Sequence, residues 1–254
     1  MHINRKVGAG IAVLGSLLLA VSGAVPAFAG NGPTAEFSHI TGIRFAGTAN
    51  ATSTGFAGWV FGAKAAASVT AQFKVPALKC TSTTSGIAPS SAMLTGSSTA
   101  AKVSVATVLL ACSGGKPIAI PAVIVNGTET NSTHVVHTGD LMKATVTASA
   151  TATTATIADL TAGHTFSFKK SGTGGKSFEE LIIDNAVAQG TTQLPVVNFG
   201  KISYSKGAVG GKAIGTVTPR TAVNMKTSAG VLQILTGAIT GTPPNAFTTT
   251  FKHA

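Results

Sequence analysis

The feature of this chain that most constrains its fold is a succession of short segments in which β-branched and aromatic residues alternate with small polar ones. Residues 68–75, 141–149, 165–168 and 247–251 show this period of two, with Gly, Pro, Asn or Asp between the segments. Such alternation predicts half-buried strands, and beyond the first 29 residues no segment shows the apolar face of an amphipathic helix. With abundant Thr, Val, Ser and Gly, the pattern predicts an all-β protein, a β-sandwich in a single domain.

The N-terminus has the features of a secretory signal. Arg5 and Lys6 precede an apolar run over residues 7–25, and Pro26 is followed by Ala27-Phe28-Ala29, an A-x-A cleavage site. An uncleaved membrane anchor is the alternative, but Pro26 and the glycines favour cleavage before Gly30. We therefore expect a secreted protein without a membrane span after cleavage. Its expected parts are a signal peptide (1–29), an N-terminal arm or edge strand (30–53) and the sandwich (54–254).

The expected mature chain is strongly basic. Two of the 18 Lys and Arg residues leave with the signal and all seven acids remain, so 16 basic residues give a net charge of +9. The lysines are dispersed, with only Lys169 and Lys170 adjacent in the mature part, and aromatic residues are sparse. Nucleic-acid-binding proteins cluster their basic residues, so we expect no nucleic-acid partner. A basic surface does attract anionic cell-wall polymers or lipid headgroups.

Cys80 and Cys112 are the only cysteines. In an exported chain such a pair predicts one disulfide. A metal pair or a nucleophilic thiol lacks support, because there is no Cys-x-x-Cys and no histidine close to either cysteine in sequence. Closing a loop of this length stabilises the fold by roughly 3–4 kcal/mol in the chain-entropy model.

The histidines form no convincing metal-ligand pattern. His134 and His137 would lie on opposite faces of a strand, which is unsuited to chelation, and we expect both to be solvated loop residues. His39, His164 and His253 are scattered and receive no role. The chain also lacks a Gly-x-Ser-x-Gly elbow, a phosphate-binding loop and a dinucleotide fingerprint. We expect neither a cofactor nor a metal ion.

Three of the seven acidic residues fall in one short apolar tract, residues 178–184. If this tract is a strand, Glu180, Ile182 and Asp184 share one face. Asp184 then lies at the end of the strand, where a carboxylate can reach a groove. A basic chain that places scarce carboxylates there either pairs them with lysines or uses one of them chemically.

A series of tracts in fixed order carries a family resemblance. The tracts are Phe56-Ala57-Gly58-Trp59-Val60, Val69 to Pro76 followed by Cys80, Cys112-Ser113-Gly114-Gly115-Lys116-Pro117, Gly139-Asp140-Leu141, Asp159-Leu160-Thr161-Ala162-Gly163, and Glu180-Leu181-Ile182-Ile183-Asp184 with Leu194-Pro195 and Asn198-Phe199-Gly200 downstream. In this order they resemble the glutamic peptidases (the eqolisin family), especially bacterial secreted members. The resemblance covers about 200 residues, which makes it far more specific than any single motif.

The resemblance implies a two-sheet, concanavalin-like β-sandwich with a peptide-binding groove across one face. Members of the family use a Glu as general base and a Gln to stabilise the oxyanion. The Glu falls at Asp184, and the Gln aligns with Val105; a slip of one or two residues brings Ser104 or Thr107 there instead. Glu180 and Trp59 are the candidate binding residues, although Trp59 also suits a core position.

The two catalytic replacements favour a protein that binds rather than cleaves. An aliphatic side chain cannot donate to an oxyanion, and losing one such donor costs about 10²–10³ in rate. Shortening the base displaces its oxygens by about 1 Å, which can cost roughly 10²-fold. The first hypothesis is therefore an inactive, secreted binding or wall-associated protein. The alternative is an acid endopeptidase with Asp184 as base, and a structural coat component is a third class.

Overall fold

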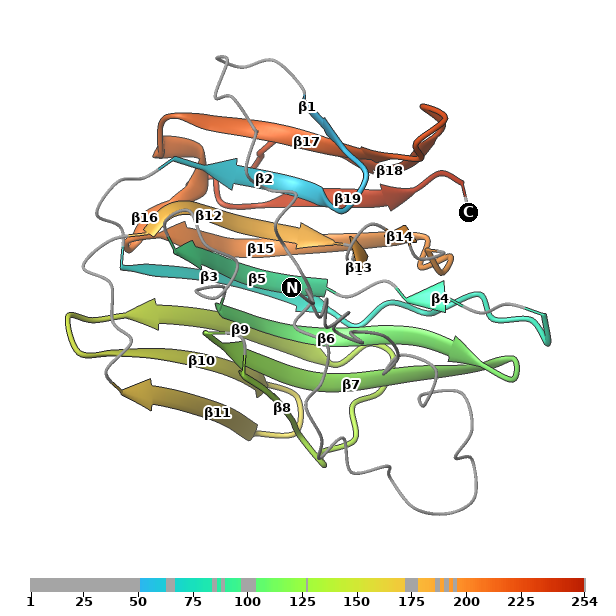
Figure 1. Ribbon diagram of the computed structural model, residues 1–254, viewed down its shortest axis with the longest axis horizontal. Coiled ribbons are helices and arrows are strands. Elements are labelled where there is room, and N and C mark those ends of the chain that lie inside the picture. Colours follow the sequence, from blue (N-terminus) through green and yellow to red (C-terminus); the bar gives the residue numbers. More distant parts are fainter. Residues whose placement is uncertain are drawn as a thin grey trace, which may run out of the picture. The chain divides into compact units, whose positions relative to one another are not determined.

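Strands that alternate between core and solvent fold this chain into two stacked layers of β-sheet, as the sequence pattern predicts (Figure 1). This computed structural model describes residues 51–62, 67–83, 86–87, 90–96, 104–126, 128–171, 178–185, 188–189, 192–193 and 196–253. For residue 87, residues 90–96 and the strands between 178 and 193 the description covers the backbone alone. The described residues belong to one compact unit.

The first layer, called layer A here, has an antiparallel body with one parallel strand at its edge. In order of neighbouring strands it contains β1 (Ala51–Ser53), β17 (Arg220–Lys226), β2 (Ala57–Phe61), β12 (Phe178–Asn185), β5 (Ser90–Gly96), β6 (Ser104–Ser113), β7 (Lys116–Val125) and β8 (Thr128–Asn131), with β4 (Gly86–Ile87) beside the end of β6. β1 pairs only with β17 among the described strands. β1 is therefore an edge strand of the described structure; the expected signal peptide (1–29) and most of the expected arm (30–53) lie outside the described residues.

The second layer, layer B, is antiparallel throughout. It contains β18 (Leu232–Thr236), β19 (Phe247–Phe251), β15 (Lys201–Val209), β3 (Ser68–Lys74), β9 (Leu141–Ala148), β10 (Ala152–Asp159) and β11 (His164–Ser171). β16 (Lys212–Ala213) forms a hairpin with β15, and β13 (Ala188–Gln189) pairs separately with β14 (Thr192–Gln193). Because β17 also pairs with β18, the two layers are continuous at one edge.

The strand pairing of β6 and β7 follows from their turn. The two residues between these strands, Gly114 and Gly115, have φ angles of 54° and 77°. Positive φ at both central positions is what a two-residue hairpin turn needs, and glycine adopts it without strain. The turn fixes the register, so Thr107 stands opposite Ala122 and Val105 opposite Ile124.

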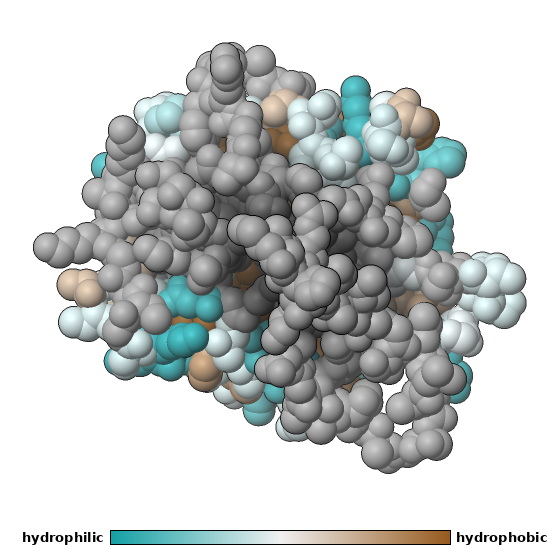
Figure 2. All heavy atoms as spheres, in the orientation of Figure 1, coloured by the Kyte–Doolittle hydropathy of each residue, from teal (hydrophilic) through white to brown (hydrophobic). Residues whose placement is uncertain are grey.

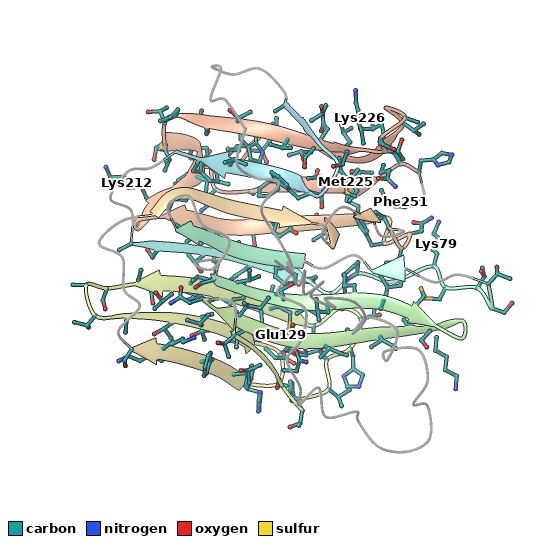
Figure 3. The ribbon with its side chains drawn as sticks, in the orientation of Figure 1. Lys79, Glu129, Lys212, Met225, Lys226 and Phe251 are labelled. Carbon is teal, nitrogen blue, oxygen red and sulfur yellow. A yellow bond between two sulfur atoms is a disulfide. The ribbon has the colours of Figure 1, made fainter. Side chains whose placement is uncertain are left out.

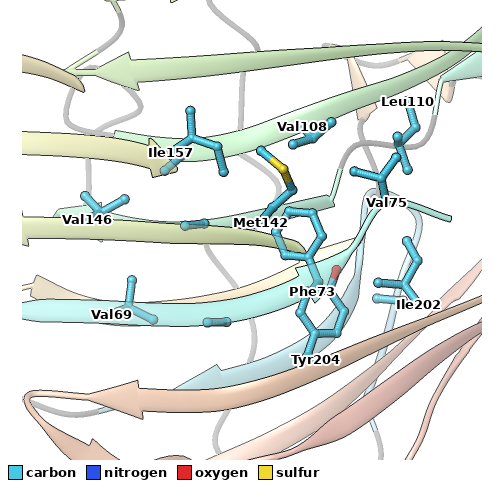
Figure 4. Close-up of a cluster of buried hydrophobic side chains, with 14 of the residues drawn as sticks. Val69, Phe73, Val75, Val108, Leu110, Met142, Val146, Ile157, Ile202 and Tyr204 are labelled. Carbon is cyan, nitrogen blue, oxygen red and sulfur yellow. The ribbon is translucent and has the colours of Figure 1, made fainter. Parts of the chain in front are cut away.

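The core lies between the layers and is built from inward-facing residues of both. On β3 and β15, Phe73 and Tyr204 are each 1% exposed, and their ring centroids lie 5.8 Å apart. Met142 of β9 and Val108 of β6 close the cluster from two further strands (Figure 4). Burying side chains of this size is the main contribution to the stability of the sandwich.

The predicted disulfide is present and ties the layers together. Cys80 follows β3 of layer B, Cys112 is the penultimate residue of β6 in layer A, and their Cα atoms lie 5.6 Å apart. Among the described residues the only helical segment is a 3₁₀ turn, Ile214–Thr216. No helix in that part of the chain is long and apolar enough to cross a membrane.

The surface matches this burial of apolar side chains. Coloured residues in Figure 2 are mostly hydrophilic or neutral, and hydrophobic surface appears in separate small areas. The exposed large hydrophobic residues in the described part are Val135, Leu160, Val231 and Leu235. Val135 and Leu160 lie in separate loops, and Val231 and Leu235 lie just before and within β18.

Candidate functional site

The acidic tract forms an interior strand of layer A. β12 runs from Phe178 to Asn185 between β2 and β5, which confirms the prediction of a strand. Asp184 is its penultimate residue and stands opposite Gly58 on one side and Ser91 on the other. Glu180 stands opposite Thr95, next to an irregularity in the pairing. Glu180, Ile182 and Asp184 therefore occupy every second position along β12.

Asp184 belongs to a cross-strand row that contains two hydroxyl residues. Ser91 of β5 is opposite Asp184, Thr107 of β6 is opposite Ser91, and Ala122 of β7 is opposite Thr107. Neighbouring strands lie about 4.8 Å apart, so the backbones at Asp184 and Thr107 are about 10 Å apart. Paired positions of an antiparallel sheet share one face. The row places a carboxylate position and a hydroxyl position at the same level of one face.

Val105 lies one level away from Asp184. It stands opposite Met93, which stands opposite Ile182. Because Val105 and Thr107 are two residues apart on β6, they share the outer face of layer A. Ser104 holds the other face, where its Oγ accepts a hydrogen bond from the backbone N–H of Asn126 at 3.2 Å. Of the three candidate positions on β6, Thr107 is the one level with Asp184.

The outer face of β6 and β7 is almost entirely aliphatic. Its remaining positions alternate with the core residues Ala106, Val108, Val123 and Val125. They are Val105, Ala111 and Ala122, which are buried, and Leu109, Ile118, Ile120 and Ile124, which are half-buried. The polar exceptions are Thr107 within β6, and Ser113 and Lys116 at the hairpin end. No residue from Ser104 to Ser113 carries an amide side chain.

Trp59 lies on the inner side of layer A. It packs against the core cluster, and its Nε1–H donates a hydrogen bond to the Gly237 carbonyl at 3.1 Å. A half-buried tryptophan usually pairs its N–H in this way. These contacts account for the ring as part of the packing between layer A and the β18–β19 connection.

Comparison with known proteins shows which family has this sequence pattern and fold. The Peptidase A4 profile matches residues 54–242. The chain belongs to the peptidase A4 family. A search of curated proteins finds no match.

Solved glutamic peptidases share the fold at low sequence identity. Scytalido-glutamic peptidase with a peptide-based transition-state analogue is similar with a TM-score of 0.60 and 13% identity, covering 78% of this chain and 98% of that one. SCP-B, an eqolisin in complex with the tripeptide Ala-Ile-His, gives 0.59 and 14% over 78% and 98% of the two chains. Aspergilloglutamic peptidase from Aspergillus niger gives 0.54 and 18% over 65% and 99%. At these identities the similarity establishes the two-layer β-sandwich.

A second group of polar residues lies away from the Asp184 row of this peptidase A4 protein. The Nε2 of His134 lies 3.0 Å from Oδ2 of Asp159, and the imidazole rings of His134 and His164 stack with centroids 4.2 Å apart. The other Asp159 oxygen, Oδ1, accepts hydrogen bonds from the backbone N–H groups of Thr161 and Ala162, both at 2.9 Å. These contacts connect the C-terminal end of β10 to the segment that follows β8.

The prediction that both loop histidines are solvated is therefore wrong for His134. Its side chain is 20% exposed, whereas the side chain of His137 is 76% exposed. No role for His164 could be predicted from the sequence, because its stacking partner is 30 residues away along the chain. Only the return of β10 and β11 brings His164 level with Asp159. Among the described residues, no group of three or more His, Cys, Asp or Glu side chains is placed to hold a metal ion.

Two described carboxyl groups have shifted pKa values, in opposite directions. Burial raises the pKa of Asp159, but the hydrogen bonds from His134, Ala162 and Thr161 outweigh it and hold the pKa below its usual value. For Glu129, at the β8 edge of layer A (Figure 3), desolvation raises the pKa and a hydrogen bond with Asn131 opposes that rise only in part. Glu129 stands opposite Ile124, beside the aliphatic positions of β7, which explains the low polarity around its carboxyl.

Proposed function

We propose that this protein is an exported member of the peptidase A4 family that binds peptides on the outer face of layer A and does not cleave them efficiently. The signal-like N-terminus and the Cys80–Cys112 disulfide support export. The titles of two structural neighbours name a peptide-based analogue and a tripeptide as their ligands. A wall-associated role is compatible with this proposal.

The observation that carries the proposal is the composition of β6 and β7. An efficient glutamic peptidase of this type needs an amide donor on this face, and the described β6 carries none. Loss of one oxyanion donor costs about 10²–10³ in rate. The four half-buried aliphatic positions, Leu109, Ile118, Ile120 and Ile124, instead suit apolar side chains of an extended peptide, whose burial provides affinity without chemistry.

A binding experiment with unfolded, fluorescently labelled casein tests this face. Leu109→Asp and Ile120→Asp each place a charge among the aliphatic positions, and we expect each to weaken binding roughly 10-fold or more, because a buried carboxylate is costly. Thr147→Asp, on the outer face of layer B, is the matched control and should leave binding unchanged. Equal binding by all three folded variants would exclude this face as the peptide site.

The second candidate is an acid endopeptidase that uses Asp184 as general base. The observation in its favour is the cross-strand row, which sets Ser91 and Thr107 level with Asp184. In this reaction the Asp184 carboxylate takes a proton from the attacking water, and a hydroxyl donates to the oxyanion. A hydroxyl replaces the amide of other members with a shorter donor, so weak activity is expected.

Proteolysis of the same casein between pH 2 and 7 separates the two candidates. The binding proposal predicts no cleavage by the wild-type chain at any pH. Acidic cleavage that disappears in Asp184→Ala would instead establish the endopeptidase.

Two reconstructed pairs sharpen this test. Asp184→Glu with Thr107→Gln restores both residue types within one row, whereas Asp184→Glu with Val105→Gln places the amide one level away. We expect the first pair to gain cleavage over the second. Equal activity of the two folded pairs would show that the row does not define the catalytic geometry.

A further inference from the structure

The outer face of layer B has a chemistry of its own. Strands β15, β3, β9, β10 and β11 lie side by side in that order (Figure 1). Their outward positions alternate with core residues such as Phe73, Met142 and Ile157. Hydrogen bonds between side-chain hydroxyls on neighbouring strands confirm the alignment. The Oγ1 atoms of Thr70 and Thr145 lie 2.9 Å apart, and Oγ1 of Thr156 lies 2.8 Å from Oγ of Ser167.

This face is rich in hydroxyl groups and carries no acid at its described outward positions. Those positions are Lys201, Ser203, Ser205 and Ala208 on β15; Ser68, Thr70, Gln72 and Lys74 on β3; Leu141, Lys143, Thr145 and Thr147 on β9; Ala152, Thr154, Thr156 and Ala158 on β10; and Thr165, Ser167, Lys169 and Ser171 on β11. Asp159 of β10 occupies an inward position, opposite Met142. All charge at these positions is therefore positive.

The strand register sets the four lysines on one diagonal line. Lys143 on β9 is opposite Gln72, two residues from Lys74 on the neighbouring β3. On the other side of β3, Tyr204 of β15 is opposite Phe73. By this register, Lys201 of β15 lies two residues beyond the level of Lys74, on the side away from Lys143. The line from Lys201 through Lys74 to Lys143 thus advances by one strand and two residues at each step.

The same step continues the line in the other direction. Thr145 is two residues from Lys143 on β9 and stands opposite Thr156 of β10, so Thr156 is the next position of the line. The next step leads to Lys169 on β11, because Thr154 is opposite Lys169. Lys252, two residues beyond Thr250 in the partner strand of Lys201, extends the line at its other end. All five lysines are exposed, and Thr156 is the only position of the line that lacks a positive charge.

The spacing of the line is regular. One strand across is about 4.8 Å and two residues along is about 6.8 Å, so successive positions lie about 8 Å apart. The six positions span about 40 Å of one sheet face. Lys206, which lies in the irregular part of β15, is the described lysine of these strands that stands outside the paired positions.

We propose that this lysine line binds a linear polyanion of the cell wall, a chain of phosphodiester-linked polyols. Such a chain carries one negative charge in each short repeat, and an evenly spaced row of ammonium groups matches repeating charges better than a scattered set does. The Thr and Ser hydroxyls beside the line can donate hydrogen bonds to phosphate oxygens and accept them from polyol hydroxyls. This site is independent of the peptide-binding face of layer A.

Other polyanions fit the face less well. Single-stranded nucleic acids are held by aromatic side chains that stack on bases, and the described outward positions include no aromatic residue. Proteins that lie on membranes insert large apolar side chains, and Leu141 is the only large apolar residue at these positions. The lysines also form a line rather than the broad patch that suits a lipid surface.

The test measures binding of the full chain to poly(glycerol phosphate) over a range of salt concentrations. The line variant carries Lys74→Gln, Lys143→Gln and Lys169→Gln. The matched control carries Lys79→Gln, Lys116→Gln and Lys212→Gln, which removes the same charge elsewhere; Lys79 and Lys212 lie towards opposite ends of the strands (Figure 3). All six lysines are exposed, so both triple variants should fold.

We expect the line variant to lose affinity on the order of 10²-fold at low salt, from the usual contribution of a lysine near an anionic surface. The slope of log affinity against log salt should fall by about 2, since each neutralised phosphate contributes roughly 0.7. The control should change both quantities much less. Equal losses by the two triple variants would overturn the proposal, because they would show that only net charge matters.

A gain-of-function pair tests the geometry directly. Thr156→Lys completes the line and should tighten binding and steepen the salt slope, whereas Thr147→Lys adds the same charge away from the line. No difference between these variants, or no binding of poly(glycerol phosphate) by the wild-type chain, would also overturn the proposal. Equal or tighter binding of oligo(dT) or of anionic lipid vesicles would assign the line to another partner class.

Discussion

The outer faces of the two layers differ sharply although the same strand alternation builds both. On β6 and β7 of layer A, the outward positions are aliphatic apart from Thr107 and the pair Ser113 and Lys116 at the hairpin end. On β3, β9, β10 and β11 of layer B, they are Thr, Ser and Lys with few apolar residues. The inward residues of both layers are alike, because they share one core.

The difference shows that the fold constrains only half of each strand. Inward positions must be apolar and of suitable volume, whichever layer they belong to. Outward positions can differ between the layers, so layer A carries aliphatic side chains there while layer B carries hydroxyl groups and a line of lysines.

Neighbouring residues of β3 should differ most in their effect on stability. Phe73→Ala removes a fully buried ring between the layers and should lower the free energy of unfolding by about 3–5 kcal/mol. Lys74→Gln, one position along and exposed, should change it by less than about 0.5 kcal/mol. Urea unfolding followed by tryptophan fluorescence measures both. Similar losses for the two variants would contradict the assignment of inward and outward faces.

Removing the disulfide should weaken both faces together. Cys80→Ser with Cys112→Ser releases the covalent link between the layers and should cost about 3 kcal/mol in the chain-entropy model. Thermal unfolding of the double variant, compared with the wild-type chain before and after reduction, measures this. An unchanged melting temperature would argue against a stabilising role for this bridge.

Asp159 should make stability dependent on acid pH. Its pKa is lowered in the folded protein, so its contribution is present above the ordinary value of about 3.9 and is lost as the pH falls through that value towards the folded-state pKa. Asp159→Asn should lower stability at neutral pH by about 1–3 kcal/mol and flatten this acid dependence. Urea unfolding from pH 2 to 7 provides the curves. Parallel curves for variant and wild-type would remove Asp159 as the cause.

Glu129 should change the pH dependence of stability in the opposite direction to Asp159, and by a smaller amount. Its pKa is raised in the folded protein, so ionisation opposes folding and stability is lost as the pH rises through the ordinary value and then the folded-state pKa. Glu129→Gln should remove this loss and raise the free energy of unfolding at neutral pH by about 0.3 kcal/mol, since solvent screens an exposed group. The same urea series measures it. A destabilised Gln variant at neutral pH would show that the charge is favourable.

Local patterns in the sequence account for much of this structure. Period-two alternation predicts β3, β9, β11 and β19, the glycine pair 114–115 suits the β6–β7 turn, and the two cysteines predict their bridge. The order of the sequence tracts indicates the family, and the profile match over residues 54–242 confirms it. Each of these signals depends on residues close together in the chain or on a motif of fixed order.

The arrangement of side chains between distant strands was decided by the tertiary structure alone. Thr107 is level with Asp184 because β5 lies between β6 and β12, and the sequence alignment alone favoured Val105. His134 meets Asp159 and His164, and the lysines align across β15, β3, β9 and β11, through register that no single segment encodes. The physical reason is that strand order and register come from the shared core, whereas alternation within one strand is local.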